Sequence, residues 1–269
     1  MQLADPLQAS WHASLSLDFD FKEGKTRLAG RRHEGPLVVQ KPLYPEGPEV
    51  CHAIVVHPPG GIAGGDSLAL HVAAGEQSNA LLTTPGAAKW YRSAGPWATQ
   101  KLEFDVRGTL EWLPRETIVY DGALAELKCE VRLGTRARYI GWEIVCLGRT
   151  GSGERFSRGS LRLHSRIMRD DKPLWLECGE LGGGSALMRS PVGLGGRTVF
   201  GTLVATDVPA ALGMKCREIT PATLLPGLLV ARYLGDSTEE AFGRFSTLWS
   251  LLRPALVERQ AATPRIWST

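Results

Sequence analysis

Short apolar segments, separated by glycine and proline, run along most of this chain and limit the folds open to it. The segments 67–72 and 102–106 alternate apolar with polar residues, a period of two that turns one face of a β-strand inward and the other toward water. Glycine accounts for 31 of the 269 residues, above the usual share of about 7%, as many tight turns require. The pattern predicts an all-β fold of many short strands.

One segment near the end of the chain has helical periodicity instead. Ser237 and Glu240 match a capping box, in which the serine accepts a hydrogen bond from a backbone amide and the glutamate reaches back. Aromatic residues from Phe242 to Trp249 then follow at helical spacing, and Pro254 predicts the end of the helix. We expect the aromatic face to pack on the sheet, with a partner-binding face as the alternative.

Length and composition exclude several classes of protein. No apolar run approaches the roughly 18 residues of a membrane-spanning helix, and the first residues show no signal-peptide pattern, which predicts a cytoplasmic protein without a membrane partner. No linker divides the chain, so a single domain over residues 1–269 is expected. Five widely spaced cysteines form no C-x-x-C pair and are expected to be reduced thiols, buried as small apolar residues: Cys51, Cys129, Cys146, Cys178 and Cys216.

Positive charge gathers in one stretch of the sequence. Between residues 131 and 169 there are nine arginines and two acids, whereas the whole chain carries a net charge of only +3. Such a belt can meet an acidic partner or nucleic acid, or can lie on solvated strand faces. No known nucleic-acid-binding motif accompanies it, so nucleic acid is not the expected partner. We expect contacts with acidic protein surfaces through Arg136, Arg138, Arg158 and Arg162.

The common catalytic motifs are absent from the sequence, including the P-loop, H-E-x-x-H and G-x-S-x-G. The most distinctive segment is HPPGGIAGGD, which begins at His57 and ends at Asp66. Prolines and glycines could bring this imidazole and carboxylate together as a site for a divalent transition metal. The alternative is a structural loop in which Asp66 accepts hydrogen bonds from backbone amides.

A second group of acids lies in the segment 110–123. Glu111, Glu116 and Asp121 stand within eleven residues of one another, beside aromatic residues. Carboxylates in such a group can bind a cation or act in acid–base chemistry. The alternative is that they form ion pairs with Arg92 and Arg115.

Three segments, in this order and spacing, resemble the urease accessory protein UreD family, called UreH in some organisms: 57–66, 83–93 and 110–123. The segment GRTGSGERF at 148–156 and the final PRIWST at 264–269 resemble further parts of that family, so the resemblance runs from about Trp11 to Thr269. Ala88 and Arg115 depart from the family pattern, in which a small hydroxyl residue and glutamine are common.

The resemblance implies a non-catalytic scaffold rather than an enzyme. Family members help to build the dinuclear nickel centre of urease: they bind UreF, UreF holds the GTPase UreG, and the assembly docks on urease apoprotein. GTP would then bind only to UreG, and this chain would hold no tightly bound cofactor, only nickel in transit. The family fold is an irregular β-helical stack of short strands with about two helices.

The resemblance also suggests which residues serve these roles. Asp66 matches the position most readily placed on the nickel path, and His57, Glu116, Asp121 and Glu143 are further candidates. Trp249 and Trp267 join the four arginines as candidates for partner contacts. The alternative function is a metal-dependent hydrolase or a nucleotide-binding enzyme that uses the glycine-rich loop 57–66.

Overall fold

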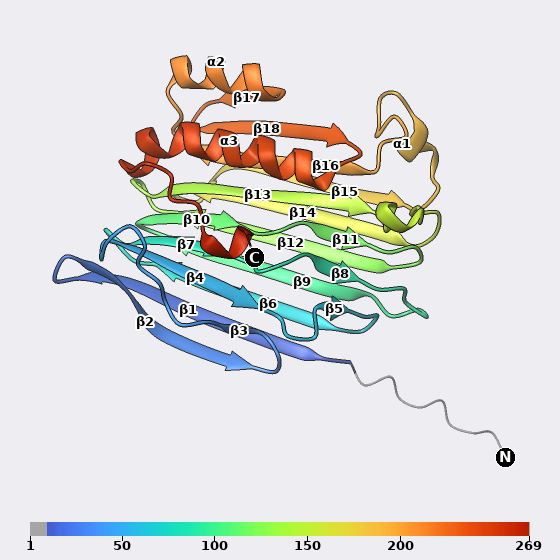
Figure 1. The fold of residues 1–269 in the computed structure, drawn as a ribbon, viewed down its shortest axis with the longest axis horizontal. Helices are drawn as coiled ribbons and strands as arrows, with labels where there is room; N and C mark the ends of the chain where they lie inside the picture. Colours follow the sequence, from blue (N-terminus) through green and yellow to red (C-terminus); the bar gives the residue numbers. More distant parts are fainter. Residues whose placement is uncertain (1–9, 269) are drawn as a thin grey trace.

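The computed structural model describes residues 10–268, which form two β-sheets packed face to face with helices on the outer side of one of them (Figure 1). The first sheet has seven strands: β1 (His12–Lys22), β2 (Lys25–Glu34), β6 (Ser67–Ala74), β9 (Ala98–Val106), β12 (Leu124–Leu133), β14 (Ser160–Arg169) and β15 (Lys172–Gly182). Across this sheet the strand order is β15-β14-β12-β9-β6-β1-β2, so β15 and β2 are its edges.

The second sheet has eleven strands: β3 (Val38–Val39), β4 (Val50–Val56), β5 (Gly61–Ile62), β7 (Asn79–Thr83), β8 (Ala88–Trp90), β10 (Thr109–Leu113), β11 (Thr117–Val119), β13 (Arg138–Leu147), β16 (Val199–Thr206), β17 (Ala222–Leu225) and β18 (Leu228–Gly235). Its main order is β17-β18-β16-β13-β10-β7-β4-β3, and the short strands β11, β8 and β5 continue from β13. The strand-rich fold predicted from the sequence is confirmed.

The chain winds between the two sheets as it builds them. From β6 to β13 the longer strands alternate between the first and second sheet, and each pairs in parallel with the strand from the turn before. In the second sheet Val50 pairs with Asn79, Asn79 with Thr109 and Thr109 with Arg138, so successive turns add 29, 30 and 29 residues. This winding agrees with the expected β-helical stack. The sequence shows no fixed-period repeat, because each turn fills its positions with different side chains.

Beyond the winding segment from β6 to β13, which we call the coil, several strands pair antiparallel instead. β14 pairs in parallel with β12 but antiparallel with β15, and β16, β18 and β17 extend the second sheet by antiparallel pairing. Both sheets are therefore mixed. Alternation along each strand places one set of side chains between the sheets, as Leu68, Leu70 and Val72 show on β6, where all three are buried in the inter-sheet core.

A second apolar core lies between the eleven-stranded sheet and the helix α3 (Thr238–Val257), which lies over the sheet roughly along its strands in Figure 1. The serine half of the predicted capping box is confirmed, because Ser237 Oγ accepts a hydrogen bond from the amide of Glu240 at 3.1 Å. The helix continues past Pro254 to Val257, so the predicted end is wrong. Pro254 lies in the last turn, and burial of Leu256 and Val257 favours keeping that turn helical.

The structure contains further short helical segments. These are α1 (Ala186–Arg189), α2 (Ala210–Ile219) and the 3₁₀ turns Thr150–Ser152 and Arg265–Ser268. Within residues 10–268 there are thus three α-helices, of which α1 is a single turn, in line with the small number expected. Within residues 10–268, no helix combines the length and apolar character needed to cross a membrane.

Candidate functional site

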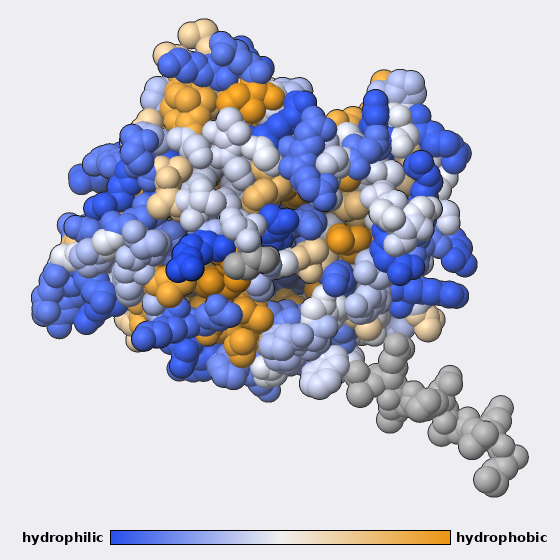
Figure 2. Space-filling view, in the orientation of Figure 1, coloured by the Kyte–Doolittle hydropathy of each residue, from blue (hydrophilic) through white to orange (hydrophobic). Residues whose placement is uncertain are grey.

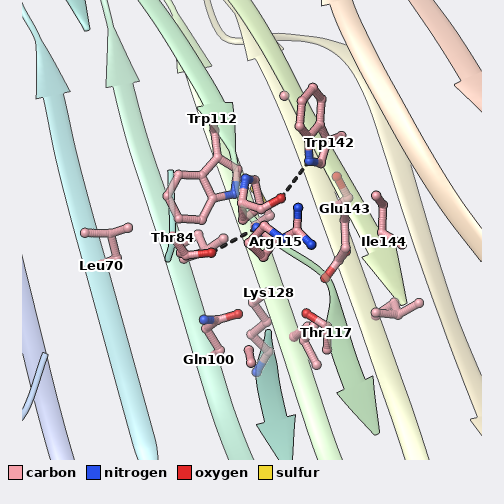
Figure 3. A pocket seen from close by; sticks show the side chains of 18 of the residues that line it. Leu70, Thr84, Gln100, Trp112, Arg115, Thr117, Lys128, Trp142, Glu143 and Ile144 are labelled. Carbon is pink, nitrogen blue, oxygen red and sulfur yellow. Dashed lines mark hydrogen bonds between the residues drawn. The ribbon is translucent and has the colours of Figure 1, made fainter. Parts of the chain in front are cut away.

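A cavity of about 400 Å³ lies between the two sheets, beneath the middle of β13. Its walls combine apolar side chains of the inter-sheet core with polar ones, among them Gln100, Thr117 and Glu143, which Figure 3 shows. Four further polar residues line it: Ser165, Glu177, Thr202 and Arg232. A cavity needs only about 10–15 Å³ of such space to hold one water, so this volume has room for several. Pro85, Gly86 and Lys89 are exposed yet also line the cavity, which marks where it meets the surface.

Glu143 is the carboxylate that β13 directs into the cavity. On this strand Tyr139 and Val145 face the inter-sheet core, whereas Ile140 and Trp142 face α3, so the alternation places Glu143 between the sheets. Burial and, to a smaller degree, the nearby carboxylate of Glu177 raise the pKa of Glu143 to about 7. Glu143 therefore exchanges between its neutral and charged forms near neutral pH.

An ion pair joins the two sheets at the far side of the same cavity. Arg232 Nη2 on β18 lies 2.7 Å from Glu177 Oε1 on β15, and Arg232 Nη1 donates to Thr202 Oγ1 at 2.7 Å. The guanidinium also stacks near Trp175, with its carbon 5.3 Å from the ring centroid. Among the residues that the structure describes, none accepts a hydrogen bond from the buried indole nitrogen of Trp175, so a water in the cavity is its natural acceptor.

His57 lines the cavity from the loop that follows β4. Its Nε2 is buried and accepts or donates no hydrogen bond within residues 10–268. Burial lowers the pKa of the imidazole, and the charge of Asp66 opposes that effect only partly. Burial therefore favours the neutral imidazole at the cavity wall, the form in which histidine binds transition metals.

The glycine-rich loop 57–66 makes a tight turn held by its own backbone. The amide of Gly60 donates to the carbonyl of His57 at 2.8 Å, and Gly60 has a φ of 68°, a conformation that glycine adopts without strain. A Cβ at Gly61 would collide with the ring of Tyr91. Glycine at both positions is therefore explained by backbone shape and close approach.

Asp66 occupies a different place from His57. Its side chain is 4% exposed and does not line the cavity. Its Oδ1 accepts from the amide of Trp11 at 2.8 Å, and its Oδ2 accepts from the amide of Ala63 at 2.7 Å. Both oxygens therefore tie the loop to itself and to the start of β1, which is the structural alternative considered for this residue.

Replacing Asp66 by alanine is expected to destabilise the chain by about 3 kcal/mol, because two buried amides lose a charged acceptor. Asp66→Asn keeps one acceptor and should lose about half as much. Urea unfolding of the two variants against the unchanged chain measures the difference. An unchanged unfolding midpoint for Asp66→Ala, combined with reduced nickel delivery, would contradict the structural role and favour the metal role.

Two further acids from the sequence prediction also lie off the cavity. Asp121 accepts five hydrogen bonds from Ser157 and Arg158, between 2.6 and 3.0 Å, and these bonds outweigh burial and lower its pKa. Glu116 Oε2 lies 3.5 Å from Arg115 Nε, without a close hydrogen bond of its own. Of the five candidate nickel residues, only His57 and Glu143 line the cavity.

Comparison with known proteins identifies the family. The sequence matches the UreD urease accessory protein family over residues 12–268. The chain belongs to the UreD family. The urease accessory protein UreD of Azoarcus sp. strain BH72 is 53% identical over 272 residues, which cover 97% of this chain and 95% of the relative. The UreD proteins of Dechloromonas aromatica and Pseudomonas aeruginosa are each 51% identical, and the matches cover 97% of this chain and 95% and 96% of theirs.

Membership of the UreD family establishes an accessory role in urease maturation. The family is non-catalytic, and the relatives are named as accessory proteins rather than as enzymes. The prediction that this chain is not an enzyme is thus confirmed, and the hydrolase or nucleotide-binding alternative is wrong. The glycine loop 57–66 on which that alternative depended is explained by backbone packing instead.

The arginines of this UreD-family chain are mostly engaged within the fold. Arg158 pairs with Asp121 at 2.6 Å, and Arg138 donates to the last carbonyls of α3. Arg162 pairs with Glu180 at 3.0 Å and lies over the ring of Trp97. Arg136 is exposed in the turn before β13. Three of the four arginines are therefore engaged within the fold, and Arg136 stays a candidate for a partner contact.

The two tryptophans proposed for partner contacts lie on the α3 side of the UreD-family fold. Trp249 is 1% exposed, and its Nε1 donates to Glu111 Oε2 at 2.6 Å, so its assignment to a partner surface is wrong. Trp267 is partly exposed, and its Nε1 donates to Thr83 Oγ1 at 2.8 Å. Figure 2 shows apolar side chains exposed over α2 and β17, where Met214 is 61% exposed.

Sequence reasoning missed the other polar residues of the cavity, above all Glu177 and Arg232. The available signal was a charged residue at an inward position of an otherwise apolar strand. Arg232 stands among Val230, Ala231 and Tyr233 in β18, as Glu143 stands in β13. Charged residues in such strands are buried only with a partner or beside water.

Proposed function

We propose that this UreD-family chain is a cytoplasmic scaffold that passes nickel to urease apoprotein through the cavity between its two sheets. It acts with UreF and with the GTPase UreG, and GTP binds to UreG alone. The observation that carries the proposal is Glu143, a carboxylate held inside the inter-sheet cavity by a strand that is otherwise apolar there. A buried carboxylate is costly for a fold unless it has a use or a partner.

The donors in the cavity suit a nickel ion in passage. Glu143 and Glu177 supply carboxylate oxygens and His57 supplies a neutral imidazole, all on one continuous lining. Within residues 10–268, no group of three or more histidine, cysteine or acidic side chains is arranged to hold a metal ion. Donors that act singly or in pairs bind an ion weakly enough to release it to the next position, as conduction requires.

The exposed end of the cavity is where we place contact with partners. Pro85, Gly86 and Lys89 form that mouth, and an assembly docked there would receive the ion without exposing it to solvent. Arg136 and the exposed part of Trp267 are further candidates for partner contacts. An acidic partner surface would complement Arg136.

A urease operon expressed with and without this chain, at limiting nickel, tests the proposal. The complete operon should yield urease with bound nickel and urea hydrolysis, and the chain should co-purify with UreF and UreG. Omitting the chain should lower both nickel content and activity by an order of magnitude or more. Full activation in its absence would overturn the proposed function.

A further inference from the structure

A group of reactive side chains lies on the outer face of the seven-stranded sheet. Glu126 on β12, His164 on β14 and Cys178 on β15 alternate with inward-facing residues of their strands, such as Leu127, Leu161 and Glu177, so they lie on the opposite face. His164 also borders the cavity. His164 pairs directly with Cys178 in the strand register. Since β15 is the edge strand of its sheet (Figure 1), Cys178 has no neighbouring strand on one side.

The three side chains form a chain of contacts. Cys178 Sγ lies 3.2 Å from His164 Nδ1, within hydrogen-bond distance for sulfur, and His164 Nε2 lies 3.7 Å from Glu126 Oε1. An imidazolium next to a thiol stabilises the thiolate, and a carboxylate at the far nitrogen orients the ring and stabilises its charge. The charged neighbours on this face are Lys128, Arg162, Arg166 and Glu180.

Cys178 differs from every other cysteine of the chain. Cys51, Cys146 and Cys216 are buried, and burial raises the pKa of each thiol. Cys129 faces the cavity wall, where burial and the charge of Glu143 raise its pKa to about 12. Cys178 is exposed, which contradicts the expectation that all five cysteines are buried. It alone combines access with a histidine partner, the two properties that make a thiol reactive.

We propose that Cys178 is a site of reversible thiol modification, at which the thiol forms a mixed disulfide with a low-molecular-weight disulfide. His164 acts as the base and Glu126 positions its ring. We favour exchange over acyl transfer because Cys178 lies on an exposed strand surface and does not line the inter-sheet cavity, so within residues 10–268 no enclosed site for an acyl group adjoins it.

The exchange needs only the Cys178 thiol and the small disulfide as reactants. His164 takes the proton of Cys178, and the thiolate attacks one sulfur of the small disulfide. A bond from Sγ to that sulfur forms as the original sulfur–sulfur bond breaks, and the departing thiolate takes up the proton. The Cys178 sulfur is oxidised, and the departing sulfur is reduced to a thiol. A second small thiol reverses the reaction.

The full chain, first reduced and then treated with excess glutathione disulfide in the presence of a chelator, tests the proposal. Mass spectrometry of peptides should find the adduct on Cys178, formed at pH 7 about tenfold faster than on a short cysteine peptide. His164→Gln should lower the rate to about that of the peptide, and Glu126→Gln should lower it about two- to threefold. Equal rates for Cys178 and the peptide, or for His164→Gln and the unchanged chain, would overturn the proposal.

Two controls separate lost activation from lost access. His71→Gln changes a histidine on the first sheet whose Nε2 lies 2.9 Å from Asp105 Oδ2, with no thiol in the pair, and should leave the rate unchanged. At pH 10, where ordinary thiols are ionised, the unchanged chain and His164→Gln should react alike.

Discussion

Replacing Glu143 by glutamine is expected to abolish nickel delivery to urease apoprotein while making the chain itself more stable. Glutamine keeps the size and one acceptor of the side chain but removes the anionic oxygen that a nickel ion would bind. Delivery is measured as nickel bound per urease after expression of the whole operon, and it should fall at least tenfold. The increase in stability follows from the pKa of Glu143.

Burial and the charge of Glu177 raise that pKa from the ordinary 4.5 to about 7. Between these values the folded chain keeps a proton that the unfolded chain has released, so the free energy of unfolding decreases as pH rises from about 4.5 to about 7. Above about pH 7 the folded chain bears the full destabilisation from the ionised Glu143, and below about pH 4.5 that destabilisation is absent. One pKa unit corresponds to about 1.4 kcal/mol, and water in the cavity reduces the effect, so Glu143→Gln should gain about 2 kcal/mol at pH 8.

Urea unfolding at pH 8 and at pH 5 checks this expectation. The advantage of Glu143→Gln should be largest at pH 8 and small at pH 5. Glu130→Gln is the matched control, because Glu130 lies on the outer face of β12, 3.2 Å from Arg132, away from the cavity. A variant that delivers nickel normally would remove Glu143 from the path. If Glu143→Gln is less stable than the unchanged chain at pH 8, the buried charge of Glu143 does not destabilise the fold, and the prediction is wrong.

Replacing Arg253 by methionine is expected to cost about 3–5 kcal/mol, enough to unfold much of the chain at physiological temperature. Arg253 is 0% exposed and lies between two buried carboxylates. Its Nε is 2.9 Å from Glu111 Oε2, and its Nη2 is 2.8 Å from Glu46 Oε1. Burial opposes ionisation of Glu46, but hydrogen bonds from His52 and Arg253 outweigh it and lower the pKa of this carboxyl.

Methionine fills a similar volume but leaves both carboxylates without their cation, and an uncompensated buried charge is what makes such a loss large. Arg253→Lys keeps the charge without the two-sided geometry and should lose less. Arg197→Met is the control, since Arg197 pairs with Asp236 at 2.6 Å on the surface and should cost less than about 1 kcal/mol. Guanidinium unfolding of the three variants ranks them. Similar losses for Arg253→Met and Arg197→Met would contradict the role of burial.

The sequence predicted the strands and the long helix because their signals are local. Alternation in 67–72 and the cap at Ser237 depend on neighbours a few residues away. The layout of the sheets depends on parallel pairs about thirty residues apart, and no local pattern specifies such partners. The coil was predicted only through the resemblance to the UreD family.

The same limit governs the cavity and the buried charges. Glu143 and Glu177 stand on strands of opposite sheets, and only the packing of those sheets brings them to one space. Glu46 and Arg253 are 207 residues apart in the sequence. Arg253 carried a sequence signal only as the residue before Pro254, which predicted a helix end rather than a buried ion pair. Acids proposed from a motif alone, such as Asp66, were instead satisfied by backbone amides.

The winding of the chain between the sheets has a consequence for how the molecule assembles. Each turn contributes a strand to both walls of the cavity, and within the coil its contacts reach mainly to the turns before and after. Folding can therefore propagate from turn to turn, as in solenoid proteins, with each finished turn serving as the template for the next. It also means that neither wall can gain or lose a strand of the coil independently. Deleting one turn would shorten both walls together and draw the remaining cavity-lining side chains into a new register.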